Sequence, residues 1–401
     1  MALSVFFPSV SGLDAQSHAM GQISTNIANI STVGYRTNET MFYTLLGSNP
    51  VVKGNQVDLA SSHADAHGVG YYDRTNIFKT GNVVSSGGNY DVAINGDENA
   101  FFYFKDSFNN DYYSRAGNFS TRTQNDVTYL VNQNGMKVQG FEALESGGFS
   151  SAPSDIIIKY PEVIPPTPTT EATITANVPA DGVDNAMYGI TVYAPTHDGE
   201  TLNMRFSKVE GELNTWNLSF TVDGGTAVGS ETKVVFNSKG EVETPKTLTV
   251  DINWNDGDTN SIALDISNMT QLAGGTGTTN VKQDGSPSGN FVRSYIGDGG
   301  VVQALYSNGK TYDIAKLTVV GFSSAENLTP INGTLFEANG QTGNIYYVEN
   351  ANLEPQALEQ SAANVEEQFG KMIVVQRAYS LNSSAFTTSN EMVQTAINLK
   401  S

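Results

Sequence analysis

The sequence contains no cysteine. This absence excludes disulfide bonds, thiolate zinc sites and cysteine nucleophiles. Positive charge is also scarce, because 21 Lys and Arg residues face 41 Asp and Glu residues, which gives a net charge of −20. Binding to phosphate groups requires a basic face. The charge balance therefore argues against nucleic acid and against an anionic membrane surface as partners.

Long apolar runs are missing as well. No stretch of 18 apolar residues is present, so we predict no membrane insertion. The N-terminal residues lack the basic segment and the small-residue cleavage site of a secretory signal. We therefore expect no cleaved leader, although export by a route that keeps the N-terminus remains open.

Catalytic motifs are absent. Histidine occurs only at positions 18, 63, 67 and 197, and neither a G-x-S-x-G nor an H-E-x-x-H motif is present. No nucleophile is therefore paired with a base, and we predict that the protein is not an enzyme and has no catalytic residues.

Two stretches could be mistaken for metal sites. His63 and His67 have the spacing of ligands on a helix, but glycines follow them and no third ligand is evident. The segment that starts at Asp251 begins like a calcium loop, yet Asp256 and Ile262 replace the required Gly and Glu. We therefore predict no metal and no cofactor.

The chain is rich in glycine, with 39 residues, and in the small polar residues typical of tight turns. This composition favours a mainly β fold, with helices only at the ends. A chain of 401 residues exceeds what one hydrophobic core usually supports, so we expect two to four domains.

The clearest helical pattern runs from Leu358 to Leu399. Alternating spacings of four and three residues connect the positions of the pattern, which are Leu358, Ala362, Val365, Phe369, Met372, Gln376, Tyr379, Ser383, Phe386, Asn390, Val393 and Ile397. This is the spacing of a coiled-coil seam, and further apolar residues beside it predict more than one neighbouring helix. The alternative is an ordinary core helix of a globular domain.

A matching segment lies at the other end of the chain. The same spacing of three and four residues, starting at Leu3, connects Phe6, Val10, Leu13, Ser17, Met20, Ser24 and Ile27. Pro8 predicts that this helix begins near that residue or kinks there, and Asn29 to Gly34 supply signals for its end. Paired terminal helices that are apolar and poor in charge predict assembly at that end.

Between the helices, alternating apolar and polar residues predict antiparallel β domains of barrel or sandwich type. A proline-rich boundary and a Gly-rich return linker set off an acidic middle region. The predicted nested organisation is an inner helical polymerisation domain (1–34 with 356–401), an extended connector (35–72), a discontinuous β domain (73–145 with 290–355) and an inserted outer β domain (146–289).

Motifs at both ends resemble one known family. Asn26-Ile-Ala-Asn29 and Gly34-Tyr35-Arg36 resemble the N-terminal signature of bacterial flagellar axial proteins, and Gln376-Arg377-Ala378-Tyr379 resembles their C-terminal signature. Between them, Tyr90 to Gly96 and Tyr113 to Phe119 resemble the inner β domain of that family. Hook proteins match most closely, and the resemblance covers roughly the first 145 and the last 110 residues.

The resemblance implies a helical homopolymer, a curved and flexible tube that passes torque from rod to filament as a universal joint. Its implied partners are further copies of the chain, rod and hook-filament junction proteins, the hook cap and the flagellar export apparatus. A distal rod or junction protein of the same family is an alternative. The acidic middle region alone would fit a surface adhesion or carbohydrate-binding module.

The predicted polymer interface combines the family motifs with the heptad positions. Its residues are Leu13, Met20, Asn26, Ile27, Asn29, Leu358, Val365, Phe369, Met372, Ile373, Gln376, Arg377, Tyr379, Phe386, Val393 and Ile397.

Overall fold

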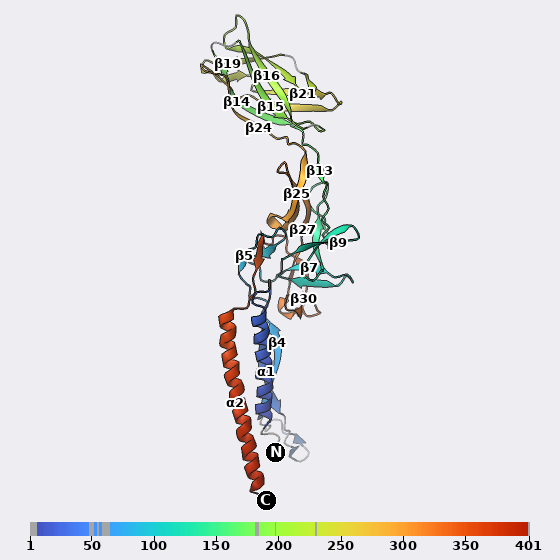
Figure 1. The fold of residues 1–401 in the computed structure, drawn as a ribbon, viewed down its shortest axis with the longest axis vertical. Coiled ribbons are helices and arrows are strands. Elements are labelled where there is room, and N and C mark those ends of the chain that lie inside the picture. The colour runs from blue at the N-terminus through green and yellow to red at the C-terminus, as the bar shows by residue number, and fades with distance from the viewer. Residues whose placement is uncertain are drawn as a thin grey trace. The chain divides into compact units, whose positions relative to one another are not determined.

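The computed structural model describes residues 6–47, 52–53, 56–57, 65–180, 184–196, 198–228 and 231–399. The chain is mainly β with a long helix near each end, as the sequence predicts (Figure 1). It divides into two compact units. Unit 1 comprises Met1–Lys159, Ser294–Gln303 and Asp313–Ser401, and unit 2 comprises Tyr160–Arg293 and Ala304–Tyr312. The chain passes between the units within β25 (Gly289–Ile296), β26 (Val301–Tyr306) and β27 (Thr311–Leu317).

The first helix, α1, spans Phe7–Ala28. Pro8 lies in its first turn, where a missing backbone N–H costs nothing. After Ala28 the backbone N–H of Asn29 still reaches the carbonyls of Thr25 and Asn26. The prediction that this helix begins near Pro8 and ends close to Asn29 is confirmed.

The second helix, α2, spans Val365–Asn398. Its N-cap is Asn364, whose side chain accepts hydrogen bonds from the backbone N–H groups of Glu366 and Glu367. The predicted start at Leu358 was wrong. Leu358 lies in β33 (Ala357–Glu359), which pairs with β5 (Val83–Ser85) and so commits its backbone to a strand.

The residues after α1 form a two-stranded ribbon. β1 (Asn38–Gly47) and β4 (Asp65–Thr75) pair antiparallel, with Asn38 opposite Thr75 and a bulge between Leu45 and Leu46. Within the predicted connector at 35–72, the described residues thus include two extended arms that are paired with each other. A further short pair, β2 (Val52–Lys53) with β3 (Gln56–Val57), lies between them.

The β part of unit 1 is built around aromatic residues. Phe101 makes edge-to-face contacts with Phe322 and Phe336 at ring-centre distances of 5.8 Å, a favourable geometry for buried rings. Its other elements are β6 (Val92–Ile94), β7 (Ala100–Lys105), β8 (Asp111–Ser114), β9 (Ser120–Gln124), β10 (Val127–Val131), β11 (Lys137–Glu142), β12 (Ser154–Asp155), η1 (Asp298–Gly300), β28 (Val319–Phe322), η2 (Ala325–Asn327), β29 (Thr329–Asn332), β30 (Leu335–Glu337), β31 (Ile345–Tyr347) and β32 (Leu353–Pro355).

Unit 2 contains two sheets that share one hydrophobic core. One sheet has the order β18-β21-β22-β14-β23, with β24 also on β14, and the other has the order β15-β16-β17-β19-β20. The bounds are β13 (Val163–Ile164), β14 (Glu171–Pro179), β15 (Asn185–Val192), β16 (Glu200–Lys208), β17 (Thr215–Val222), β18 (Gly225–Val228), β19 (Thr232–Phe236), β20 (Val242–Thr244), β21 (Thr247–Trp254), β22 (Thr259–Asp265), β23 (Thr270–Leu272) and β24 (Gly277–Gln283).

The sandwich follows from the alternation in the sequence. Along β15 every second residue is buried, including Ile190 and Val192 at 0% exposure. One feature departs from the predicted antiparallel arrangement, because β14 pairs in parallel with β22 and β23.

Candidate functional site

The two helices lie side by side in unit 1, and the β1–β4 ribbon packs against α1 (Figure 1). The buried residues of α1 are small over most of its length: Ser9, Gly12, Ala15, Ala19, Ile23 and Asn26. Small side chains let two helices approach closely. At Gly12 an added Cβ would lie 2.8 Å from the side chain of Asn382 on α2, so the Asn382 side chain lies directly against α1 there.

This buried line differs from the predicted seam of α1. Leu13, Met20 and Ile27 are only half-buried, and the buried residues lie beside them on the helix. The heptad argument selected large apolar residues, whereas close packing against a second helix and a ribbon selects small ones.

The contact line of α2 is also displaced from the predicted seam. Gln368 is fully buried in α2, and Val375 and Asn382, one heptad and two heptads further on, are half-buried. Near the N-terminal end of α1, Phe6 packs its ring at 5.3 Å from the ring of Phe386.

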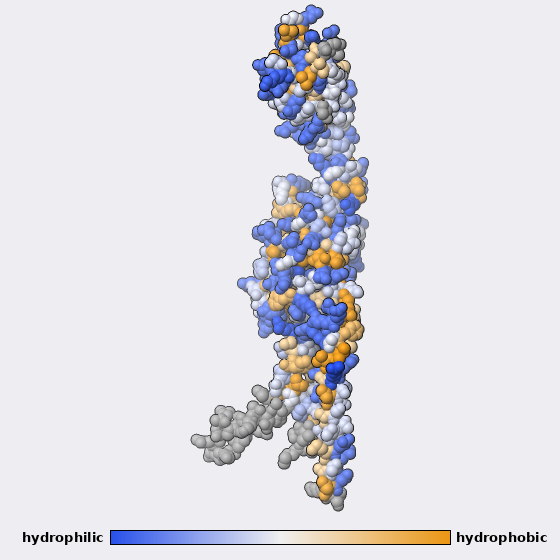
Figure 2. Space-filling view, turned by 90° about the vertical axis from the view of Figure 1, so that its left-hand side faces the viewer, coloured by the Kyte–Doolittle hydropathy of each residue, from blue (hydrophilic) through white to orange (hydrophobic). Residues whose placement is uncertain are grey.

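Most predicted interface residues of α2 stay exposed within the chain. Val365, Phe369, Ile373, Tyr379, Phe386 and Ile397 keep between 37% and 63% of their surface exposed. Gln376 and Arg377 are exposed too, while Met372 and Val393 are half-buried. Figure 2, which faces α2, shows hydrophobic residues at the surface of this helical region. Intrachain packing therefore leaves these apolar residues available to another chain.

Asn26 joins the two helices to the start of the ribbon. Its amide nitrogen donates to the carbonyl of Asn38 at 2.8 Å and to Oε1 of Gln368 at 3.1 Å. Its Oδ1 accepts from the hydroxyl of Tyr35 and from the backbone N–H of Asn38, both at 3.0 Å. Asn26, predicted at the polymer interface, is only 1% exposed and bonds entirely within its own subunit. Asn29 is half-buried and donates to the carbonyl of Thr25.

A buried ionic cluster lies where the helices join the β part of unit 1. Glu359, 1% exposed, accepts from Nε of Arg115 at 2.9 Å and from the guanidinium of Arg36. The backbone N–H of Gly81 also donates to Glu359, at 3.0 Å. Burial pushes the pKa of Glu359 up, but the charges of Arg36 and Arg115 outweigh it and hold that pKa below the ordinary value. The cluster therefore keeps a carboxylate ionised inside the protein.

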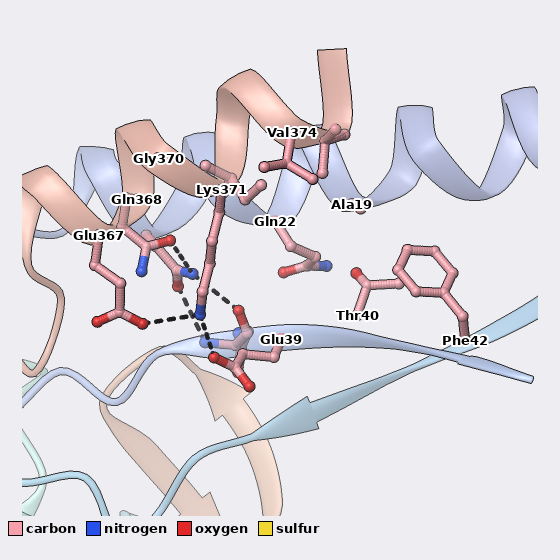
Figure 3. Close-up of a pocket in the computed structure, with 14 residues that line it drawn as sticks. Ala19, Gln22, Glu39, Thr40, Phe42, Glu367, Gln368, Gly370, Lys371 and Val374 are labelled. Atoms are coloured by element: carbon pink, nitrogen blue, oxygen red, sulfur yellow. Dashed lines mark hydrogen bonds and ion pairs between the residues drawn. The ribbon is translucent and has the colours of Figure 1, made fainter. Parts of the chain in front are cut away.

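A groove of about 460 Å³ opens between α1, β1 and α2. Its apolar lining includes Ala19, Ile23, Phe42, Val374 and Val375. The close-up in Figure 3 shows Lys371 reaching from α2 to Glu39 of β1 and to Glu367, with Phe42 and Val374 further along the groove.

The charges beside the groove are balanced. Lys371 pairs with Glu39 and, at 2.9 Å, with Glu367, and Glu367 also pairs with Lys79. Hydrogen bonds from Lys79 and Lys371 hold the pKa of Glu367 below its ordinary value. Two cations thus neutralise two carboxylates, and the groove offers apolar surface without a net charge beside it.

The stretches considered as metal sites do not form one in the described part of the chain. There, no group of three or more His, Asp or Glu side chains is placed to hold a metal ion. Asp251 lies in strand β21, and the backbone of His67 lies in strand β4. His63 is outside the described residues. Neither described helix combines the length and the hydropathy needed to cross a bilayer.

Sequence reasoning missed the residues that hold unit 1 together. Gln368, Glu359 and Arg115 were not singled out for a role, because each interaction joins segments far apart in the chain. The available signal was the family motif itself. Asn26 and Arg36 belong to the N-terminal motif, and both residues are buried.

Three family models match the chain. Residues 9–36 match the model described as flagella basal body rod protein, residues 164–286 match the flagellar basal body protein FlaE D2 domain, and residues 354–399 match the C-terminal region of the flagellar basal body rod FlgEFG proteins. The first and last segments contain Asn26, Arg36, Glu359 and Gln368, which form the two networks described above.

Several whole-length relatives are named flagellar hook protein FlgE. The protein from Brucella suis biovar 1 is 26% identical over 404 residues, which cover 98% of this chain and 97% of that one. Those from Treponema pallidum and Salmonella typhimurium are each 25% identical, covering 98% of this chain and 99% and 100% of their own lengths. The crystal structure of Helicobacter pylori flagellar hook protein FlgE2 aligns over 69% of this chain and 99% of its own, with 14% identity and a TM-score of 0.47.

The matched segments cover both terminal helices and most of unit 2, in the order in which the chain contains them. The chain belongs to the family of flagellar rod and hook proteins.

Proposed function

We propose that this chain is a structural subunit of the bacterial flagellar hook, which polymerises through its paired terminal helices. The observation that carries the proposal is the exposed apolar surface of α2. Ile373 is 50% exposed and Phe369 49% exposed, within a helix that packs along α1. Contiguous apolar surface of this kind marks an interaction site in a folded protein.

The relatives favour the hook protein over the rod proteins of the family. The models described as rod proteins match only the terminal segments, whereas the three whole-length relatives reported above are named as hook proteins. The alignment with these relatives covers almost their whole length, including the segment that corresponds to unit 2 of this chain. In the proposed arrangement the helical part of unit 1 forms the inner wall of a tube, and residues 146–289 form an outer domain. The division into domains 1–34 with 356–401, 35–72, 73–145 with 290–355, and 146–289 belongs to this proposal.

The same proposal names the mechanical role and the partners. The tube acts as a universal joint that bends while it passes torque from rod to filament. Its partners are further copies of this chain, the rod, the hook-filament junction proteins, the hook cap and the export apparatus. No chemical step is required of the protein, and its work is to hold and exchange contacts between neighbouring copies.

Immunogold labelling of isolated flagella with attached basal bodies tests the proposal. The antibody is raised against residues 146–289, and flagella from a strain that lacks the chain serve as the control. Label along the curved segment between rod and filament is the expected result. Label confined to the rod or to a junction would transfer the chain to another member of the family, and label on the cell surface away from flagella would support an adhesion module instead.

A further inference from the structure

A second apolar stripe runs along α2. Val374, Leu381, Met392 and Leu399 are separated by seven, eleven and seven residues, and at about 100° per residue these spacings keep all four within about 20° of one line. Their exposures are 66%, 72%, 69% and 84%, higher than that of any other large hydrophobic residue of α2, and Leu399 is the C-cap that follows the helix. We call these four residues the outer stripe.

The outer stripe is distinct from both other faces of α2. The line that contacts α1 passes through Val375 and Asn382, each one residue after a member of the stripe and so about 100° around the helix. The predicted heptad residues, such as Val365 and Tyr379, lie on the other side of that contact line. Within the described residues α2 thus presents two separate apolar surfaces, and one partner helix cannot cover both.

One end of the outer stripe enters the groove described above. Val374 lines the groove together with Val375 of α2, Ala19 and Ile23 of α1 and Phe42 of β1 (Figure 3). Phe42 is itself 44% exposed. The groove is therefore an open apolar recess, and the ion pairs beside it are already satisfied.

The far half of α2 has the chemistry that such a recess accepts. From residue 378 to residue 390 the helix contains no charged side chain, and Glu391 is the sole charge between 378 and 399. A charged segment would lose its hydration in the groove without gaining a partner, because Lys371 and Lys79 already neutralise Glu39 and Glu367. The far half of α2 exposes Leu381 and Met392 and has Glu391 as its sole charge, so it avoids most of that cost.

We propose that the groove of one subunit receives the outer stripe of a second copy of this chain, with Leu381 and Met392 of the second copy placed near Val374 and Phe42 of the first. This inference rests on the proposed function and names a contact within the polymer. The groove and the far half of α2 are different patches of one chain, so the contact is head-to-tail. Contacts of this type do not close into a dimer, and they extend into a helical filament when the rotation between copies does not close.

Cysteine cross-linking tests the contact, because the natural chain has no thiol of its own. The variant carries Val374→Cys together with Met392→Cys. These positions are about 27 Å apart on one helix, so their thiols cannot join within one chain. Oxidation of assembled polymers is expected to convert most of the protein into a ladder of covalent oligomers on a denaturing gel.

Two controls define the result. Each single-cysteine variant is expected to stay monomeric on the gel, since a head-to-tail contact brings two different positions together. The matched pair Val374→Cys with Asn390→Cys places the second thiol beside Met392 but on the opposite face of α2, and no ladder is expected. A dimer from Val374→Cys alone, or equal ladders from both pairs, would overturn the inference.

A second variant tests the same contact without introducing cysteines. Leu381→Asp is expected to raise the concentration needed for polymerisation at least tenfold, whereas Leu381→Met leaves it unchanged. Polymers that form normally from Leu381→Asp would overturn the contact but leave the proposed function standing. Failure of the wild-type chain to polymerise at all would overturn both.

Discussion

Asn26 of α1 and Gln368 of α2 are hydrogen bonded, Nδ2 to Oε1, at 3.1 Å, although 342 positions separate them in the sequence. Both side chains are 1% exposed. A shift of one helix along the other would break this buried hydrogen bond, so the bond favours one register of the two helices. The two ends of the chain are thereby brought together in one register.

This relationship predicts a large effect of Asn26→Ala. The substitution leaves the backbone N–H and carbonyl of Asn38, the hydroxyl of Tyr35 and the amide of Gln368 without their common partner. We expect the free energy of unfolding of unit 1 to fall by at least about 2 kcal/mol. Asn29→Ala is the control, because its side chain makes a local bond to Thr25 and it is expected to cost less. Equal losses measured by denaturant unfolding would contradict the prediction.

Two glycines of α1 are expected to respond differently to alanine. At Gly21 nothing lies within 4 Å of an added Cβ, so Gly21→Ala gains helix propensity, about 1 kcal/mol. At Gly12 the added Cβ would meet the amide group of Asn382 at 2.8 Å, and we expect Gly12→Ala to lose part of that gain because the Asn382 side chain must move aside. Thermal unfolding of both variants measures the difference. A similar stabilisation by the two substitutions would show that displacing the Asn382 side chain costs nothing.

The buried cluster around Glu359 predicts a dependence on pH. The folded state holds the pKa of Glu359 below its ordinary value of 4.5. Its contribution to stability is therefore complete above pH 4.5 and is lost as the pH falls through the lower, folded-state pKa. Glu359→Gln leaves Arg36 and Arg115 buried without their counter-charge, and we expect a cost of about 3–5 kcal/mol at pH 7.

The difference between the wild type and Glu359→Gln should shrink on acidification below pH 4.5, because protonated Glu359 resembles glutamine. Urea unfolding of both proteins at pH 7 and at lower pH measures this change. Glu326→Gln, at an exposed position of η2, is the matched control and should follow the wild type at both values. A gap between wild type and Glu359→Gln that stays constant with pH would disprove the linkage.

The helices show how far the sequence alone could lead. Pro8 predicted a start or a kink of α1 near that residue, because proline fits the first turn of a helix and disrupts its interior, and the structure shows the start. The start of α2 was predicted too early, because Leu358 fits the heptad spacing although it lies in a strand. The side chain of Asn364, an N-cap acceptor with glutamates at the second and third positions after it, was the better signal.

The candidate site was less accessible from the sequence. Heptad spacing identified the apolar residues of α2 but not which of them face α1, because hydrophobicity does not report how closely two helices approach. Gly12 and Ala19 lie at the contact and contribute little to any apolar pattern. Glu359 was unrecognisable because its two arginine partners lie in separate segments, and no local motif links them.

The exposed heptad surface gives the most direct test of assembly. Ile373 is 50% exposed in the folded chain, so Ile373→Asp can keep its carboxylate hydrated and should leave the thermal unfolding of the monomer nearly unchanged. In a polymer that covers this surface the same carboxylate would be buried without a partner, at a cost of several kcal/mol per subunit. We therefore expect Ile373→Asp to abolish polymerisation in a sedimentation assay, while Ile373→Leu assembles normally. Tubes formed by Ile373→Asp at the wild-type concentration would mean that this face of α2 is not a subunit interface, because no tight contact between copies tolerates an unpaired charge at its centre.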